Sequence, residues 1–290
     1  MAEKDITEKI LMWYNDIFSD IINVLLFQGA DRVHPDSLED KNPISQYKAS
    51  DNRIHEEERD VFKLWKNGKL GLAMYGLENE TKTEKYLPFR LIGYDGASYR
   101  TQLLSGDEPK VPVISLVLYF GANHWSAPKT LHDLVELPEG LEKYFNDYKI
   151  NVFEISWLTD DQLKMFESDF GVVADFFVNK RKNPDYVPTD KRTIKHVDAV
   201  LKLLSVMTGD NRYENILTEE KKEGIQNMCD VAERLEKRGY DNGYDNGYDN
   251  GYDSGRKDER IIIYKDLIKD GVYTPEQASQ KSGIPEEELR

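Results

Sequence analysis

Three carboxylate side chains stand where two short strands would bring them together. Asp60 opens a strand-like run over residues 60–65, and Glu78 and Glu80 lie near the end of a second run over residues 70–80. An Asn-Gly dipeptide in the turn between these runs is typical of a tight β-hairpin. Residues two apart on a strand project to one face about 7 Å apart, so pairing of the strands would bring Asp60 near Glu78 and Glu80.

Such a patch points to divalent metal chemistry. Like charges that close need a cation or a proton to coexist. Hard oxygen ligands suit Mg²⁺ or Mn²⁺, which often binds one or two carboxylates together with a substrate phosphate. The sequence has no nucleophile elbow, P-loop or paired zinc ligands. Carboxylate and divalent metal chemistry is therefore the one enzymatic chemistry that the sequence supports. The alternative is a set of solvated acidic residues at strand ends, in a chain with 54 Asp and Glu residues.

The segments around these carboxylates resemble a known family. They are Gly76–Glu80, Leu87–Arg90, Tyr94–Asp95, Tyr99–Gln102, Lys110–Ile114, Val117–Tyr119 and His124–Trp125. Together they resemble the Rpn family of recombination-promoting nucleases and transposase-like proteins in the PD-(D/E)XK nuclease superfamily. The likeness covers roughly residues 6–160. It implies an α/β fold with a restriction-endonuclease-like mixed sheet flanked by helices, and metal-dependent hydrolysis of DNA phosphodiester bonds linked to recombination or mobile elements.

The resemblance also implies roles for the carboxylates. Asp60 matches the Asp of the motif and Glu78 matches its (D/E) position, so both would hold Mg²⁺ or Mn²⁺. Glu80 stands where the superfamily has Lys and where this family often has Gln. Lys or Gln can position or polarise the attacking water, whereas Glu only accepts hydrogen bonds or binds metal. Activity is therefore in doubt, and the alternative function is a catalytically weak or inactive nuclease-fold interaction protein.

Four further residues are candidates for the site. Asp20 lies on the first expected helix, from which many superfamily members place an acidic residue beside the metal. Lys82 shares the strand face of Glu80 and is the nearest lysine that could replace the missing one. Arg90 could contact phosphate and Gln102 could face the site. For each of the four, a solvated surface position is the alternative.

Composition bounds the partners. The chain has 290 residues, 39 Lys and Arg, and a formal net charge of −15. An acidic protein must concentrate its basic residues locally in order to bind DNA, the expected partner. The sole cysteine, Cys229, excludes an internal disulfide and fits a reducing compartment. The acidic N-terminus and the short apolar run at residues 111–121 predict a cytoplasmic protein without a membrane partner. A homo-oligomer remains open.

Hydrophobic patterns predict the elements and the domains. The expected helices cover residues 4–27, 87–104, 189–208 and 215–238, and the expected strands beyond the hairpin cover residues 111–120 and 151–157. Polar residues 28–57 indicate loop and short helix. The expected organisation is a nuclease-like core at 1–160, a helical extension at 161–238, a linker at 239–257 and a small helical tail at 258–290.

Residues 240–255 form a repeat, YDNG three times and then YDSG. The repeat lacks the ligand spacing and terminal Glu of an EF-hand loop. Its period of four can hold the tyrosines on one helical stripe, but each Gly costs about 1 kcal/mol in a helix. We expect a flexible or marginally helical linker. After it, Thr274 and Gln277 around Pro275 predict a helix N-terminus.

Overall fold

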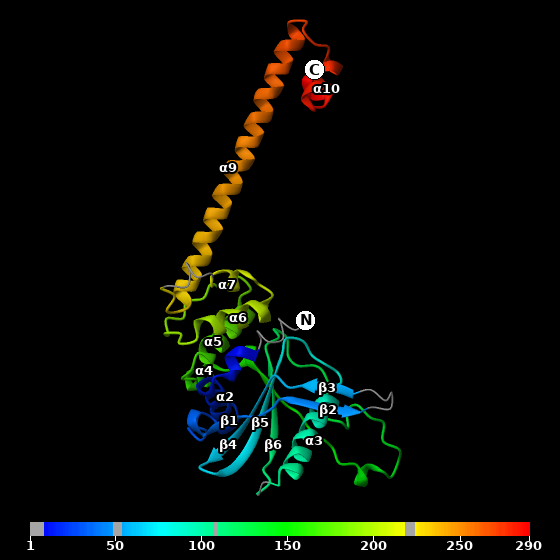
Figure 1. The fold of residues 1–290 in the computed structure, drawn as a ribbon, viewed down its shortest axis with the longest axis vertical. Coiled ribbons are helices and arrows are strands. Elements are labelled where there is room, and N and C mark those ends of the chain that lie inside the picture. The colour runs from blue at the N-terminus through cyan, green and yellow to red at the C-terminus, as the bar shows by residue number, and fades with distance from the viewer. Residues whose placement is uncertain (1–8, 49–53, 107–108, 218–223) are drawn as a thin grey trace. The chain divides into compact units, whose positions relative to one another are not determined.

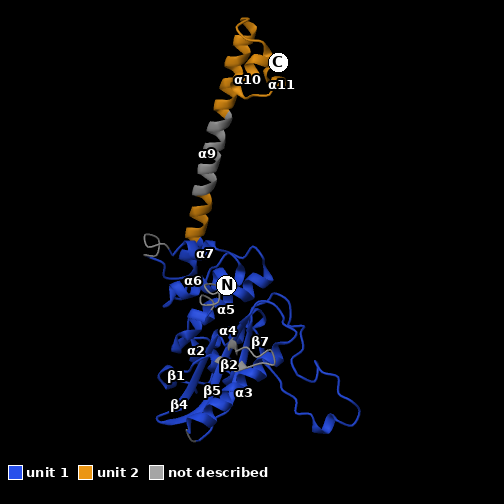
Figure 2. Cartoon of the chain, turned by 45° about the vertical axis from the view of Figure 1, so that its right-hand side comes forward, with its two compact units in different colours: residues 1–232 blue, residues 233–290 orange. Residues whose placement is uncertain are grey.

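A computed structural model describes residues 9–48, 54–106, 109–217 and 224–290 of the chain (Figure 1). The chain divides into two compact units, residues 1–232 and residues 233–290 (Figure 2). Across the described ranges, no helix combines the length and the apolar character that crossing a membrane requires.

The first unit is built on a mixed sheet of five strands in the order β1-β4-β5-β6-β7. The strands are β1 (Leu38–Asp40), β4 (Val61–Asn67), β5 (Leu70–Glu80), β6 (Val113–Tyr119) and β7 (Asn151–Glu154). The pairs β1–β4 and β4–β5 are antiparallel, whereas β5–β6 and β6–β7 are parallel. Helices flank this sheet, which confirms the expected α/β restriction-endonuclease-like fold.

The predicted hairpin is present as β4 and β5. Gly68 in its turn has a φ of +59°, which explains why glycine follows asparagine there. Next to the hairpin, parallel pairing aligns Glu80, Tyr119 and Glu154 across three strands. This row marks the carboxyl ends of the parallel strands, the edge at which open α/β sheets form their sites.

The helix expected at residues 4–27 is interrupted within its described part. Residues 9–13 are helical, and α2 covers Asn15–Phe27. Between them Tyr14 has an extended backbone with φ −67° and ψ 128°. The carbonyl of Trp13 accepts a hydrogen bond of 2.8 Å from Nζ of Lys63, a buried lysine on β4. A strand side chain therefore binds a carbonyl at the break, which the apolar spacing of the segment does not reveal.

Helix α3 (Leu87–Ser105) has nearly the predicted bounds. Pro88 lies in its first turn, where a missing N–H does no harm, and Gly106 ends it in the left-handed conformation. A cluster of buried side chains joins α3 to β6 and to the segment that follows β6: Leu87, Leu91, Tyr94, Val117, Tyr119, Trp125 and Ile150. This packing holds α3 against β6 (Figure 1).

The expectation of loop and short helix at residues 28–57 is confirmed for residues 28–37 and is wrong for the strands that follow. A 3₁₀ turn, η1 (Pro35–Ser37), is followed by β1, β2 (Ile44–Lys48) and β3 (Ile54–Glu58). Strands β2 and β3 pair in a separate antiparallel sheet. The sequence of β3 is Ile-His-Glu-Glu-Glu, which lacks the apolar alternation that signals a strand. Residues 49–53 lie outside the described residues.

Helices follow the sheet within the first unit. After β7 come the turn η3 (Ile155–Trp157) and helices α4 (Asp160–Met165), α5 (Phe170–Lys182), α6 (Val197–Thr208) and α7 (Arg212–Asn215). A further turn, η2 (Glu142–Tyr144), lies in the segment before β7. The strand expected at residues 151–157 therefore ends at Glu154.

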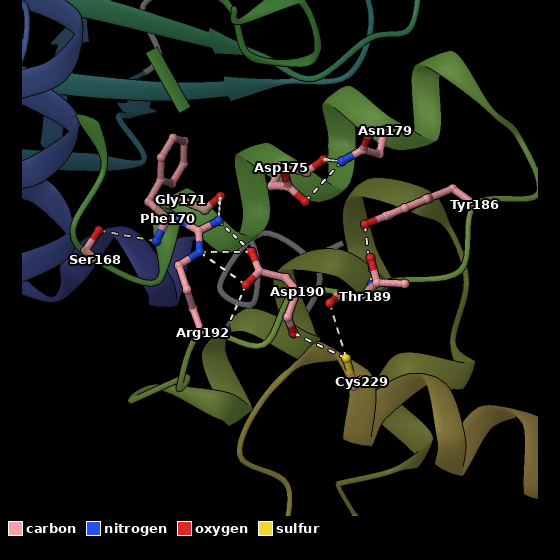
Figure 3. A network of polar contacts seen from close by, with 10 residues as sticks. All are labelled: Ser168, Phe170, Gly171, Asp175, Asn179, Tyr186, Thr189, Asp190, Arg192 and Cys229. Atoms are coloured by element: carbon pink, nitrogen blue, oxygen red, sulfur yellow. Dashed lines mark hydrogen bonds and ion pairs between the residues drawn. The ribbon is translucent and has the colours of Figure 1, made fainter. Parts of the chain in front are cut away.

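The helix expected at residues 189–208 begins only at Val197, because polar contacts hold the preceding residues in a loop (Figure 3). Arg192 pairs with Asp190 and donates a hydrogen bond of 3.0 Å to the carbonyl of Gly171 at the start of α5. The Cys229 thiol donates to the carbonyl of Thr189 at 3.2 Å. Apolar periodicity does not register such contacts.

The second unit is a small helical assembly with its own apolar cluster. Helix α9 (Met228–Lys269) begins in the first unit and runs through the tyrosine repeat, and α10 (Pro275–Ser282) and α11 (Glu286–Leu289) follow. The helix expected at residues 215–238 begins at Met228, and residues 218–223 lie outside the described residues. The capping box of Thr274 and Gln277 is confirmed. The cluster contains Ala278, Ile284 and Leu289, packed against Ile261, Tyr264, Ile268 and Tyr273.

Candidate functional site

The hairpin brings Asp60 and Glu78 together. Asp60 directly precedes β4, and the pairing of Val61 with Leu77 places it across from Glu78 on β5. Oδ2 of Asp60 accepts a hydrogen bond of 2.7 Å from the backbone N–H of Asn79. The backbone of β5 therefore orients the Asp60 carboxylate beside Glu78.

Glu78 is buried and incompletely paired. Glu78 is 4% exposed, and its Oε1 has no hydrogen-bond partner among the described residues. Burial, and then the negative charge of Asp60, raise the pKa of Glu78 well above its usual value, although Arg90 and Arg59 oppose the shift. A buried carboxylate is stable as an anion only beside a compensating cation, so Glu78 requires a proton or a positive charge.

Arg90, near the start of α3, lies against the same strand end. Its Nη2 is 2.6 Å from Oε1 of Glu80 and 3.6 Å from Oε2 of Glu78, and its Nη1 donates to Oε2 of Glu84 at 2.7 Å. Its burial lowers the pKa of Arg90, but the three carboxylates outweigh burial and raise it. Burial also raises the pKa of Glu80. Glu78 and Glu80 thus face one guanidinium nitrogen, and Glu80 is its direct hydrogen-bond partner.

Lys9 adds a positive charge beside Asp60, which the sequence analysis did not predict. Its Nζ lies 3.2 Å from Oε1 of Glu58 and 3.7 Å from Oδ1 of Asp60, and its side chain is 7% exposed. No signal in the sequence marks this lysine, because lysines of an amphipathic helix are ordinarily solvated.

Asp20 has other partners. Its Oδ2 accepts hydrogen bonds from the N–H of Ser168 at 2.8 Å, from the Ser168 hydroxyl at 2.5 Å and from the N–H of Glu167 at 3.1 Å. Burial raises the pKa of Asp20 in spite of these bonds. The structure therefore joins Asp20 to the segment before α5 and not to Asp60 or Glu78.

Gln102 contacts the segment that enters β6, and Lys82 is exposed. The buried Gln102 side chain accepts from the N–H of Val111 at 2.8 Å and donates to the carbonyl of Val111 at 3.1 Å. It fastens the end of α3 to the segment that enters β6. Lys82 is exposed in the turn that follows β5.

A buried polar network lies directly behind the site and was also missed. Arg59 precedes Asp60 in the chain, and its Nη2 lies 2.6 Å from Oδ1 of Asp95. The Ser115 hydroxyl donates to the same Asp95 oxygen at 2.7 Å, and the Tyr148 hydroxyl donates to the other oxygen at 2.7 Å. The only hint in the sequence is the acidic Asp95 on the buried face of α3.

The donor set fits a hard divalent cation. No three His, Cys, Asp or Glu side chains converge on a metal position within the described ranges. Mg²⁺, however, is commonly held by one or two carboxylates, with water and substrate phosphate in the other positions. Asp60 and Glu78 supply two carboxylates, and Oε1 of Glu78 is buried without a hydrogen-bond partner in the described part of the chain. The Glu80 carboxylate accepts a hydrogen bond from Arg90.

The comparison with protein families gives one match, which covers the middle of the chain. Residues 51–189 match the family described as "Putative transposase, YhgA-like". No curated protein and no solved structure matches the chain. The matched residues contain the hairpin, α3, β6 and β7, and the family description connects them with mobile genetic elements. Residues 51–189 are thus similar to the YhgA-like transposase family, which is the Rpn family of the PD-(D/E)XK type.

Proposed function

We propose that the protein is a metal-dependent endonuclease that hydrolyses phosphodiester bonds in DNA during recombination or the movement of mobile elements. The observation that carries this proposal is the pairing of Asp60 with Glu78. Asp60 is bound to the β5 backbone, and Glu78 has a buried oxygen for which the described residues offer no hydrogen-bond partner. Both residues lie in the segment that matches the transposase family.

The chain's own residues would hold and orient the reactants. Asp60 and Glu78 would hold Mg²⁺ or Mn²⁺, which lowers the pKa of a bound water and stabilises negative charge on the phosphate. The N–H of Asn79 keeps the Asp60 carboxylate turned toward this position. In the hydrolysis the water oxygen bonds to phosphorus, the ester P–O bond breaks, and the products are a phosphate monoester and a hydroxyl group.

The test is nicking of supercoiled plasmid DNA with Mg²⁺ or Mn²⁺, and with chelator as the blank. Low salt favours detection because phosphate contacts weaken as salt rises. Asp60→Ala and Glu78→Ala should each slow nicking at least about a hundredfold, since even the partners of metal ligands contribute about 10–100-fold. Asp161→Ala is the matched control, because Asp161 is an exposed aspartate on α4. Nicking that survives Asp60→Ala would refute the assignment.

A second candidate function is a nuclease-fold interaction protein without activity. The observation that favours it is Glu80, which binds Arg90 at the position where the superfamily has a lysine. Absence of nicking by the parent protein with either metal, together with Mn²⁺ binding that is indifferent to Asp60→Ala, would establish this candidate instead.

A further inference from the structure

The strand end is rich in negative charge. Asp60, Glu78, Glu80 and Glu84 gather near it, while a phosphodiester substrate is itself an anion. A metal ion held by Asp60 and Glu78 would neutralise part of this charge. A further positive group that the substrate can reach would offset the remaining negative charge.

We infer that Arg90 is that group, and that Glu80 and Glu84 are positioning residues that hold its guanidinium beside the scissile phosphate. This inference rests on the proposed nuclease function. It gives Glu80 a role other than that of a metal ligand, and it supplies from α3 the positive charge that position 80 of β5 lacks.

The contacts of Arg90 support a fixed guanidinium. Nη2 binds Glu80 at the end of β5, and Nη1 binds Glu84 in the turn before α3. Two anchors on different nitrogens define the plane of the group, which suits arginine better than lysine. Each Nη also carries a second hydrogen, which neither of these two bonds uses, and these hydrogens can be donated to phosphate oxygens.

Accessibility separates Arg90 from the other basic groups near the carboxylates. The Arg90 side chain is 32% exposed, whereas Lys9 is 7% exposed and Arg59 is 2% exposed. Lys9 is paired with Glu58 and Asp60, and Arg59 is enclosed by the network of Asp95. Among these three, Arg90 alone combines a position beside Glu78 with access for a substrate.

The position is suited to the transition state. Negative charge grows on the phosphoryl oxygens during hydrolysis, and a donor already held in place stabilises it without reorganisation. Helix α3, packed on β6, and the two glutamates supply this fixed geometry.

The first test measures DNA binding, which does not depend on turnover. Fluorescence anisotropy of a labelled duplex oligonucleotide is recorded with Ca²⁺ over a salt series. Loss of one phosphate contact lowers the salt slope of log K by about 1. Arg90→Ala should show this loss, and Arg90→Lys should retain the slope. Lys69→Ala is the charge-matched control, because Lys69 lies in the hairpin turn at the opposite ends of β4 and β5.

An unchanged slope in Arg90→Ala, or an equal loss in Lys69→Ala, overturns the inference. A parent protein that binds no duplex overturns the inference and the proposed function together. Melting curves show whether each variant is folded. If Arg90→Ala is unfolded, Arg90→Lys replaces it as the test, and the inference then requires Arg90→Lys to bind DNA with the salt slope of the parent.

The second test moves the positive charge. Arg90→Ala should nick plasmid more slowly than the parent, while titration calorimetry shows Mn²⁺ binding at least as tight. Adding Glu80→Lys to Arg90→Ala should restore nicking, which a merely structural role of Arg90 would not allow. Faster nicking by Arg90→Ala would show that Arg90 competes with the metal and would overturn the inference. A parent that binds duplex but never nicks refutes the proposed function, and the salt slope then decides the inference separately.

Discussion

Glu78 combines deep burial with incomplete compensation. Arg90 approaches it to only 3.6 Å and is bound more closely to Glu80 and Glu84, so the pKa of Glu78 stays raised. The unfolded chain ionises this carboxyl at its ordinary pKa, whereas the folded chain retains the proton to higher pH. The contribution of Glu78 to the free energy of unfolding is therefore fully present below the ordinary pKa of the carboxyl. It is lost as pH rises through the pKa that Glu78 has in the folded chain.

Metal-free protein should consequently respond to Glu78→Gln in a pH-dependent way. At pH 8 in chelator the neutral amide removes the cost of a buried anion, and we expect Tm to rise by about 2–4 °C for each kcal/mol regained. Near pH 4 the parent side chain is protonated as well, so the two Tm values should converge. Differential scanning calorimetry from pH 4 to pH 8 measures the difference. A difference independent of pH would show that Glu78 is already compensated as an anion.

At the scale of elements, the sequence predicted what depends on local pattern. The Asn-Gly turn and its flanking runs identified β4 and β5, and their register placed Asp60 beside Glu78. Apolar runs identified α3 and β6. Strand β3 was missed because its sequence is acidic, and the break at Tyr14 was missed because a distant lysine binds at it.

For the site, too, the sequence predicted only what depends on local spacing. Spacing along one strand shows that Glu78 and Glu80 share a face, but it does not show that Arg90 binds Glu80. The buried positions of Lys9 and Arg59 arise from packing between elements far apart in sequence. The contacts of Lys9 and Arg59 therefore could not be predicted without the tertiary structure.

The junction of β5, α3 and β6 should be intolerant of added volume at Gly76. A Cβ there would lie 2.2 Å from Nη1 of Arg59, which is held by Asp95 on α3 and by Ser115 on β6. Gly76→Ala should therefore lower the free energy of unfolding by about 1–3 kcal/mol, the usual cost of overpacking. Urea denaturation measures this loss.

Gly96→Ala is the control for that substitution. A Cβ at Gly96 on α3 meets no atom of the described residues within 4 Å, and alanine is favoured over glycine in a helix interior by about 1 kcal/mol. The control should be neutral or stabilising. Equal stability of Gly76→Ala and the parent would mean that Arg59 can leave its network at little cost.

At the scale of the whole molecule, each unit has an apolar core of its own. The family match ends at residue 189, yet the first unit continues to residue 232. Its last part includes the beginning of α9, where Met228 and Val231 are 1% and 0% exposed. The tyrosine repeat and the helices after it belong to the second unit.

Two truncations should consequently differ sharply. Deletion of residues 240–290 removes the repeat and the second cluster but retains Met228 and Val231, so Tm of the remaining chain should stay within about 2 °C of the parent, less than the shift from 1 kcal/mol. Deletion of residues 228–290 also removes these two buried side chains, each worth about 1.5–3 kcal/mol on burial. That chain should melt at least about 6 °C lower. Calorimetry of both truncations beside the full chain tests this boundary, and a large loss of Tm in the shorter deletion would show that the first unit depends on residues 240–290.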